Sequence, residues 1–148
     1  MMATLIRLPQ VWVLGFAVIG WLLGRLVPVR LPLGLDLAGT FLIVAGIVLM
    51  IWAALIMRRA GTTVMPGQKP ARLVTWGPFA FSRNPIYLGD ALVLTGIMLA
   101  GHAVLGLIMV PAFILLANAL FIRAEEAMLS REYGADFAAY CAVTRRWL

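Results

Sequence analysis

The chain has 148 residues, of which 64% are hydrophobic and 12% charged, and its mean hydropathy is +1.01. This composition excludes an ordinary soluble domain and predicts a single integral-membrane domain. The formal net charge is +6, but the basic residues flank apolar runs, which is typical of contact with lipid headgroups rather than nucleic acid. We therefore expect a membrane environment and no nucleic-acid partner.

Two apolar runs in the first half predict membrane spans at residues 8–26 and 36–57, separated by a short loop rich in Pro and Gly. Gly20 and Gly24 are four residues apart in the first run. This spacing permits a close helix–helix contact. Glycine is also common in membrane helices without any such contact, and we take this as the simpler interpretation of the pair.

Residues 58–84 form the one extended polar stretch between apolar runs, with several Pro and Gly residues. We interpret it as a structured cytoplasmic loop. Residues 73–79 within it are apolar enough to lie on the membrane surface or on the helical bundle.

The second half contains 32 consecutive uncharged residues, from Ala91 to Ile122. One helix of that length would be about 48 Å long at about 1.5 Å per residue, which exceeds a hydrocarbon core of about 30 Å. We therefore predict two spans, at residues 85–100 and 103–123, joined by a tight turn at Gly101 and His102. A single His at such a turn is more simply an interfacial residue than a functional one.

The tail, residues 124–148, is polar and basic, with apolar and acidic residues at near-helical spacing. Gly134 predicts a break between two short helices. We interpret Arg146 as an interfacial anchor, like Arg58 and Arg59 near the second span.

The expected fold is all-α: an integral membrane protein with four transmembrane helices and a cytoplasmic C-terminal helical segment. With both termini inside, ten of the 12 basic residues, Arg7 and Lys69 among them, lie on the cytoplasmic side. This agrees with the positive-inside rule. We expect a bacterial inner-membrane protein with its active site on the cytoplasmic side.

Residues 83–90 predict the start of the third span. Pro85 suits the first position of a helix and Asn84 suits the N-cap. The free N–H groups of such a start favour an anion, with Arg83 just outside. Asp90 follows within two turns, and an ionisable group inside a membrane helix is a functional hypothesis by default.

Glu125 and Glu126 form a carboxylate pair that we place at the cytoplasmic end of the fourth span. Two carboxylates at a helix C-terminus are disfavoured by the dipole and by each other, so we expect a cationic partner. The hairpin of the last two spans brings this pair to the same side as Arg83. No metal site is predicted.

Four ordered motifs carry a resemblance to a known family. They are Leu-Val-x-x-Gly-Pro-Phe at 73–79, Arg-Asn-Pro-x-Tyr-x-Gly at 83–89, Glu-Glu-x-x-Leu at 125–129, and Tyr133, Gly134 and Tyr140 in the tail. The chain resembles the isoprenylcysteine carboxyl methyltransferase and phospholipid methyltransferase superfamily over residues 73–146. It departs from the pattern at Asn84, where eukaryotic members have His, and at Phe137, where the family has Tyr.

The resemblance implies a membrane enzyme that uses S-adenosyl-L-methionine, held by the helix start and the Glu pair. Its ammonium would pair with Glu125 or Glu126, and its carboxylate with Arg83 and the start of the third span. The implied cofactor-binding residues are Arg83, Asn84, Pro85, Tyr87, Gly89, Glu125 and Glu126. Arg123 and Tyr140 are the implied substrate-binding residues. The implied catalytic residues are Asp90, as a general base for an amine acceptor, and Arg145.

The expected acceptor is a lipid or a small amphipathic molecule, such as an isoprenylcysteine-like carboxylate or a phospholipid amine. Two other classes stay open. One is an NADPH-dependent reductase of the sterol-reductase type, suggested by Tyr87 to Asp90 and by Tyr140 with Cys141. The other is a small membrane protein without catalytic activity. The sequence predicts no oligomeric state.

Overall fold

The computed structural model describes residues 9–63 and 70–148, and within these ranges it contains helices and no strand. The expected all-α class is therefore confirmed for the described residues. In chain order the elements are α2 (Pro9–Gly24), α3 (Leu33–Arg59), the 3-10 helix η1 (Gly77–Ala80), α4 (Pro85–Ala100), the 3-10 helix η2 (Val104–Ile108), α5 (Met109–Ala117), the π-helical turn η3 (Asn118–Ile122) and α6 (Arg123–Val143).

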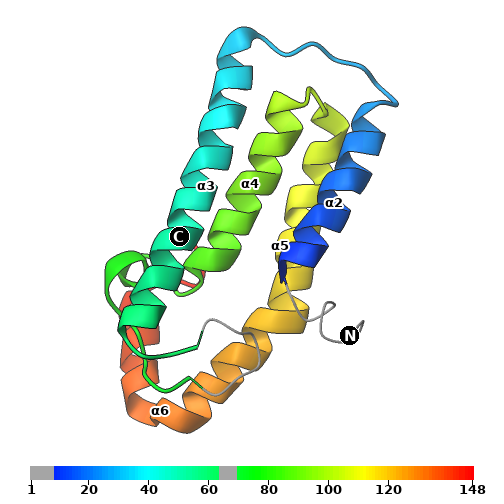
Figure 1. Cartoon of the computed structure of the whole chain (residues 1–148). Helices are drawn as coiled ribbons and strands as arrows, with labels where there is room; N and C mark the ends of the chain where they lie inside the picture. The colour runs from blue at the N-terminus through cyan, green and yellow to red at the C-terminus, as the bar shows by residue number, and fades with distance from the viewer. Residues whose placement is uncertain (1–8, 64–69) are drawn as a thin grey trace.

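Helices α2, α3, α4 and α5 lie side by side along one long axis (Figure 1). α4 packs on α3, on α2 and on α5. The α2–α3 connection and the turn after α4 lie at one end, whereas η1 and α6 lie at the other. The start of α4 and the beginning of α6 therefore meet at the same end of the bundle.

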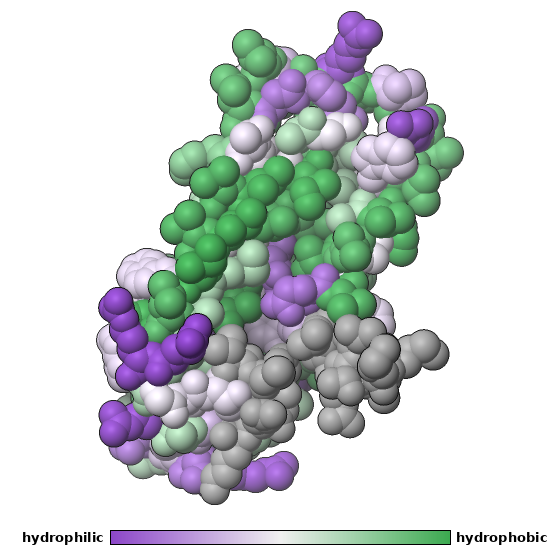
Figure 2. Space-filling model, in the orientation of Figure 1, coloured by the Kyte–Doolittle hydropathy of each residue, from purple (hydrophilic) through white to green (hydrophobic). Residues whose placement is uncertain are grey.

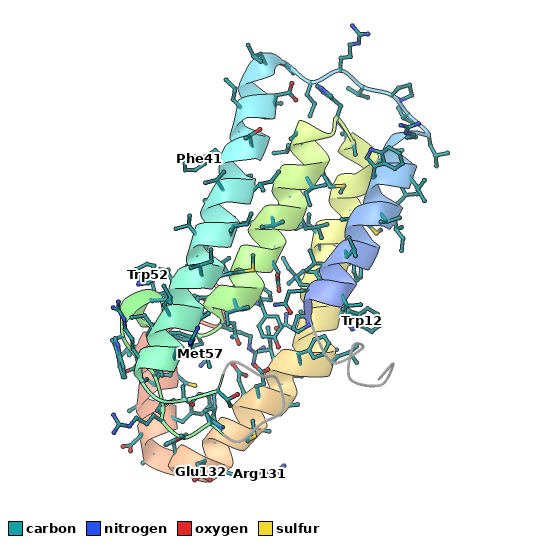
Figure 3. The ribbon with its side chains drawn as sticks, viewed as in Figure 1. Trp12, Phe41, Trp52, Met57, Arg131 and Glu132 are labelled. Carbon is teal, nitrogen blue, oxygen red and sulfur yellow. The ribbon has the colours of Figure 1, made fainter. Side chains whose placement is uncertain are left out.

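Among the described residues, two helical stretches are long and apolar enough to cross a membrane: α3, and the continuous helical run Val104–Val143. α2 and α4 are shorter apolar helices. Hydrophobic residues cover the middle of the face shown in Figure 2, and hydrophilic residues gather mainly toward the two ends. Phe41 and Trp52 of α3 point away from the bundle (Figure 3), and Phe41 is 70% exposed. An apolar surface of this extent requires a lipid or protein cover.

Glycines bring α3 and α4 into backbone contact at two levels. A Cβ atom at Gly46 would lie 2.6 Å from the carbonyl oxygen of Gly89, and one at Gly96 would lie 2.5 Å from that of Gly39. No side chain fits at these distances. The absence of a Cβ therefore sets the separation of the two helices.

The structure corrects the interpretation of Gly20 and Gly24, because both glycines lie in close contacts. Both residues are buried in α2. A Cβ on Gly20 would lie 3.2 Å from the carbonyl oxygen of Gly106, and one on Gly24 would lie 2.4 Å from the Cβ of Ala103. The pair fixes α2 against the segment that follows the turn after α4.

The predicted third span, 85–100, coincides with α4. Helix α3, at 33–59, extends beyond the predicted second span at both ends, and α2 ends at residue 24. The predicted fourth span, 103–123, overlaps the first half of the helical run Val104–Val143. The predicted first-span start at residue 8, and Arg7 and Lys69 in the charge count, lie outside the described residues. The tight turn is confirmed at Gly101 and His102, where His102 has a φ of 54°.

His102 bonds to the α2–α3 connection and to the start of α3. Its Nδ1 accepts a hydrogen bond from the amide of Leu31 at 3.0 Å, and its Nε2 lies 3.4 Å from Oδ1 of Asp36. These contacts join the two connections at the end of the bundle away from α6. They give the residue a structural role at that end.

Gly134 breaks α6 as predicted, with a φ of 44° and a ψ of −112°. The chain bends sharply within α6 and returns toward the start of α4 (Figure 1). The segment at 73–79 lies on the bundle, because Val74 and Phe79 are buried with Ala53 and Ala60. The 73–79 segment and the part of the tail after Gly134 together close the end of the bundle where α4 begins.

We expect Gly89→Ala to lower the melting temperature of the purified protein in detergent. The new Cβ would lie 2.5 Å from Cγ of Met50 and 2.7 Å from the carbonyl oxygen of Gly46, so the helices must separate, at a cost of about 1–3 kcal/mol. Gly15→Ala in α2 is the matched control, since no atom lies within 4 Å of its added Cβ. An equal melting temperature for the two variants would contradict the contact.

Candidate functional site

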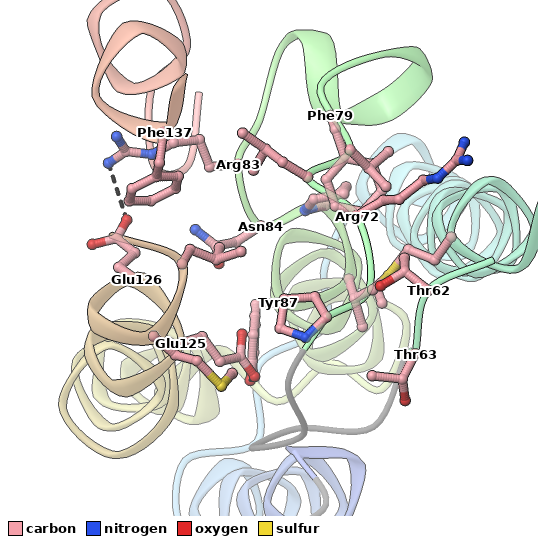
Figure 4. Close-up of a pocket in the computed structure, with 18 of the residues that line it drawn as sticks. Thr62, Thr63, Arg72, Phe79, Arg83, Asn84, Tyr87, Glu125, Glu126 and Phe137 are labelled. Carbon is pink, nitrogen blue, oxygen red and sulfur yellow. Dashed lines mark hydrogen bonds and ion pairs between the residues drawn. The ribbon is translucent and has the colours of Figure 1, made fainter. Parts of the chain in front are cut away.

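A cavity of about 360 Å³ lies at the end of the bundle where α4 begins, between residues 62–63 and 70–84, α4 and α6 (Figure 4). Most of its wall is apolar, with contributions from Met57, Phe79, Ile86 and Phe137. The polar residues of its lining are Gln10, Thr62, Thr63, Arg72, Arg83, Asn84, Tyr87, Glu125, Glu126 and Tyr140.

The start of α4 is held by the C-terminal tail. The amide of Arg83 donates to the carbonyl oxygen of Arg145 at 2.9 Å, and Nδ2 of Asn84 donates to that of Arg146 at 3.0 Å. Asn84 stands at the predicted N-cap position, but the predicted role of its side chain is wrong, because that side chain forms no capping hydrogen bond. The amide is used for a contact across the fold instead.

Glu126 binds two arginines. Its Oε1 lies 3.0 Å from Nη2 of Arg83 and accepts a hydrogen bond from Nε of Arg146 at 3.0 Å, and its Oε2 binds Nη2 of Arg146. The hydrogen bond to Glu126 raises the pKa of Arg146. Within this cluster, two positive charges therefore face one negative charge.

Arg83 retains an unused donor. Its Nε is buried and has no hydrogen-bond partner among the residues that the structure describes. The side chain is held by Glu126 and is 14% exposed. A buried guanidinium N–H without a partner costs free energy, so an anionic acceptor in the cavity would stabilise this wall.

Glu125 has a different environment from its neighbour. Its Oε1 accepts a hydrogen bond from the hydroxyl of Tyr87 at 2.9 Å, and the Tyr87 ring stacks on Phe121. It forms no ion pair with any residue in the described part of the chain. Glu125 is therefore a carboxylate on the cavity wall that can still accept a cation.

The predicted location of the carboxylate pair at a helix C-terminus is wrong. Glu125 and Glu126 lie in the first turn of α6, which continues directly from η3 and runs on to Val143. The expected cationic partner is present for Glu126. The tail returns after Gly134 and brings Arg146 to Glu126, and Arg83 reaches it from the start of α4. Repulsion at a helix end is not the reason for these ion pairs.

Tyr140 lines the cavity and also binds the loop, because its hydroxyl donates to the carbonyl oxygen of Phe79 at 2.6 Å. Tyr133 similarly donates to the carbonyl oxygen of Pro70 at 3.0 Å. These bonds fasten the tail to the 70–80 segment. Tyr140 thus has a structural contact in addition to its place on the wall.

Of the predicted site residues, the structure brings Arg83, Asn84, Pro85, Tyr87, Glu125, Glu126 and Tyr140 to the cavity wall. Four others do not line it: Gly89, Asp90, Arg123 and Arg145. Gly89 faces α3. Asp90 is 2% exposed, with its Oδ2 unpaired among the described residues. The side chains of Arg123 and Arg145 are exposed.

Sequence reasoning missed four polar residues of the cavity lining, Gln10, Thr62, Thr63 and Arg72, and also missed Arg146. Arg146, interpreted as a headgroup anchor, binds Glu126. The predicted break at Gly134 was the available signal, because a reversal there brings the end of the chain back to the carboxylates. For Thr62 and Arg72 the sequence carries no such signal, since they reach the wall through loop geometry.

A family model described as phospholipid methyltransferase matches residues 35–136, which include α3, the loop motifs, α4 and the Glu pair. The chain belongs to the phospholipid methyltransferase family. Membership implies methyl transfer to a membrane lipid and a membrane setting for the exposed apolar helices. Comparison with curated proteins and with solved structures gave no match. Of the three classes considered from the sequence, membership supports the methyltransferase.

For this phospholipid methyltransferase family member, we expect Glu126→Gln to destabilise the protein without any ligand. The change leaves Arg83 and Arg146 without a carboxylate in a largely buried site, at a cost of about 2–3 kcal/mol. Arg146→Gln should cost less, because that side chain is 37% exposed. Thermal melts in one detergent give the order. A smaller effect for Glu126→Gln than for Arg146→Gln would contradict the central role of the carboxylate.

Proposed function

We propose that the cavity binds S-adenosyl-L-methionine and that the protein methylates the amine of a membrane phospholipid. One observation carries the proposal: the cavity lining holds both Glu125, a carboxyl group without an ion pair, and Arg83, whose Nε has no hydrogen-bond partner among the described residues. The amino-acid end of this cofactor carries both an ammonium and a carboxylate. A volume of about 360 Å³ lies within the range of small-molecule sites.

Glu125 is the proposed partner of the ammonium, oriented by its hydrogen bond from Tyr87. Arg83 is the proposed partner of the carboxylate, held by Glu126 and by the tail. Asn84 and Pro85 complete this part of the wall at the start of α4. Pro85 has no N–H, and the amide of Asn84 donates to Oγ of Ser82, so the N–H groups of Ile86 and Tyr87 are the ones that this helix start directs at a negative charge.

The cofactor supplies an activated methyl group on a sulfonium. The protein positions the reactants and excludes water, and the apolar wall of Met57, Phe79 and Ile86 suits both tasks. Asp90 and Arg145, the predicted catalytic residues, have no place on this wall. We therefore leave them, with Gly89 and Arg123, out of the proposed site.

The direct test of the activity is a transfer assay with methyl-labelled S-adenosyl-L-methionine and the purified protein in lipid nanodiscs. Label should appear in N-methylated phosphatidylethanolamine. Label on a carboxylate acceptor such as a prenylcysteine, or no labelled product, would reject the proposed acceptor.

We expect Glu125→Gln to weaken cofactor binding by about 2 kcal/mol, roughly 30-fold, because it removes the partner of a cation in a desolvated site. Calorimetric titration of the detergent-solubilised protein measures the change. Asp136→Asn is the matched control, since that carboxylate is exposed on α6 and does not line the cavity. Equal affinities for the two variants, or binding of NADPH in place of S-adenosyl-L-methionine, would remove Glu125 from the proposed role.

We also propose four spans, α2, α3, α4 and the run from Val104 to about Arg123, with both termini and the cavity on the cytoplasmic side. The arrangement of these helices side by side supports the count (Figure 1), and the distribution of basic residues supports the orientation.

Cysteine labelling in intact cells tests this topology, in a background where Cys141 is replaced by Ser. A membrane-impermeant maleimide should label Arg30→Cys, between α2 and α3, and should not label Ala71→Cys until the cells are opened. The opposite pattern would reverse the orientation, and labelling of both in intact cells would reject the four-span count.

A further inference from the structure

The cavity has a second polar wall, opposite the carboxylates. Figure 4 shows Glu125 and Glu126 on the side of α6, and Thr62, Thr63 and Arg72 on the side of α3. Apolar side chains, including Ile86 and Phe79, also line this cavity. The cofactor contacts proposed above use the first wall, so the second wall faces what remains of the cavity.

Arg72 differs from the other arginines near the cavity. Arg83 and Arg146 are both bound to Glu126. Arg72 has no ion pair with any residue that the structure describes, and residues 1–8 and 64–69 contain no Asp or Glu. Its side chain is exposed at the edge of the cavity and points away from the Glu125–Glu126 wall (Figure 4). The position therefore offers a positive charge that the protein does not neutralise with a carboxylate.

Two hydrogen bonds connect Ala71, the residue before this arginine, to the end of α3 through Thr62. The amide of Ala71 donates to Oγ1 of Thr62 at 3.0 Å, and the amide of Thr62 donates to the carbonyl oxygen of Met57 in α3 at 3.0 Å. Thr62 is buried, and its hydroxyl accepts from Ala71, which leaves its O–H as a donor. Arg58 and Arg59 end α3, as expected for a helix that reaches the headgroup level there.

We propose that Arg72, with Thr62 beside it, binds the phosphate of the acceptor phospholipid at the edge of the cavity. This proposal rests on the proposed function, because it assigns the acceptor to the part of the cavity away from the cofactor contacts. In an ethanolamine headgroup, two carbons and one oxygen separate the phosphorus from the nitrogen. A phosphate held at Arg72 thus directs the amine inward, toward the first wall, while the acyl chains stay beside α3.

The charge distribution explains why the two anionic groups would use different arginines. The carboxylate of the cofactor meets Arg83, which is buried and fixed by Glu126. A lipid phosphate cannot leave the headgroup region without dragging its acyl chains out of the bilayer, so it needs a cation at the edge of the cavity. A planar guanidinium can bind two phosphate oxygens at once, which also predicts that Arg72→Lys is an incomplete replacement.

The first measurement is calorimetric binding of dihexanoyl-phosphatidylethanolamine to the full-length protein in detergent, without cofactor. Arg72→Gln should weaken binding about tenfold, since it removes a charge-assisted hydrogen bond to phosphate. Arg72→Lys should weaken it less. Arg59→Gln is the matched control, as an exposed arginine near the end of α3 that does not line the cavity, and should bind like the unaltered protein.

The second measurement is methyl transfer with two acceptors, the same lipid and a phosphate-free O-alkyl ethanolamine. With the lipid, Arg72→Gln should raise KM about tenfold and change kcat less than twofold. With the phosphate-free amine, neither constant should change, and the affinity for S-adenosyl-L-methionine should stay the same. A residue that merely supports the loop would change both acceptors alike.

The proposal would be overturned if Arg72→Gln and Arg59→Gln bound the lipid equally well. It would also be overturned if Arg72→Gln lost methyl-transfer activity equally with both acceptors, or if that variant lost affinity for the cofactor. Arg72-dependent binding of inorganic phosphate as tight as that of the lipid would also overturn it, since the site would then recognise a free anion. Lipid binding that depends on Arg72 in a protein that transfers no methyl group would support the phosphate site and reject the proposed function instead.

Discussion

The candidate site depends on the carboxylate of Glu126, which joins three parts of the chain that are distant in sequence. It binds Arg83 just before α4 and Arg146 in the tail, and the backbone of that tail in turn accepts hydrogen bonds from Arg83 and Asn84. Because Glu126 is used in this internal bridge, its charge serves the fold. The neighbouring Glu125 is left as a carboxylate that faces the cavity with a tyrosine hydroxyl as its partner. The two adjacent acids therefore have separate tasks.

This bridge forms at a defined place because the bundle sets the position of α4. Gly46 and Gly89 let α3 and α4 touch through their backbones, and Gly20 with Gly106 does the same between α2 and η2. Contacts between backbones leave little freedom for a helix to slide, since a shift of one residue would place a side chain where none fits. The residues at the start of α4 are thus positioned by contacts along the whole helix.

Helix α4 and the turn after it were predictable because their signals are local: Pro85 starts the helix, and an uncharged run too long for one crossing requires a reversal. The break at Gly134 was predictable for the same reason. The partners across the fold were not. Asn is a residue type that often caps a helix start, but the side-chain amide of Asn84 instead donates a hydrogen bond to the carbonyl oxygen of Arg146. Gly89 suggested room for a ligand, and α3 occupies that room. Arg146 was assigned to the membrane surface because sequence spacing alone does not place a tail against a carboxylate.

The separation of charges across the cavity has a consequence for how a methyl donor and a lipid would share it. On the α6 side, two arginines and Glu126 leave one surplus positive charge. Burial raises the pKa of Glu125 to about 7, so a cation bound beside it favours the ionised form, which supplies one negative charge. That wall matches a ligand end which is itself zwitterionic, so binding there adds little net charge to a partly dry space. On the α3 side, Arg72 lies at the exposed edge, where hydration lowers the cost of an unpaired charge. In the proposed binding mode, a phospholipid amine enters the cavity from this edge while its phosphate stays at the headgroup level. In this proposal, the ammonium and carboxylate of the cofactor bind as a pair without net charge in the buried part of the cavity. The unpaired cation, Arg72, stays at the edge, where the phosphate of a membrane lipid would neutralise it.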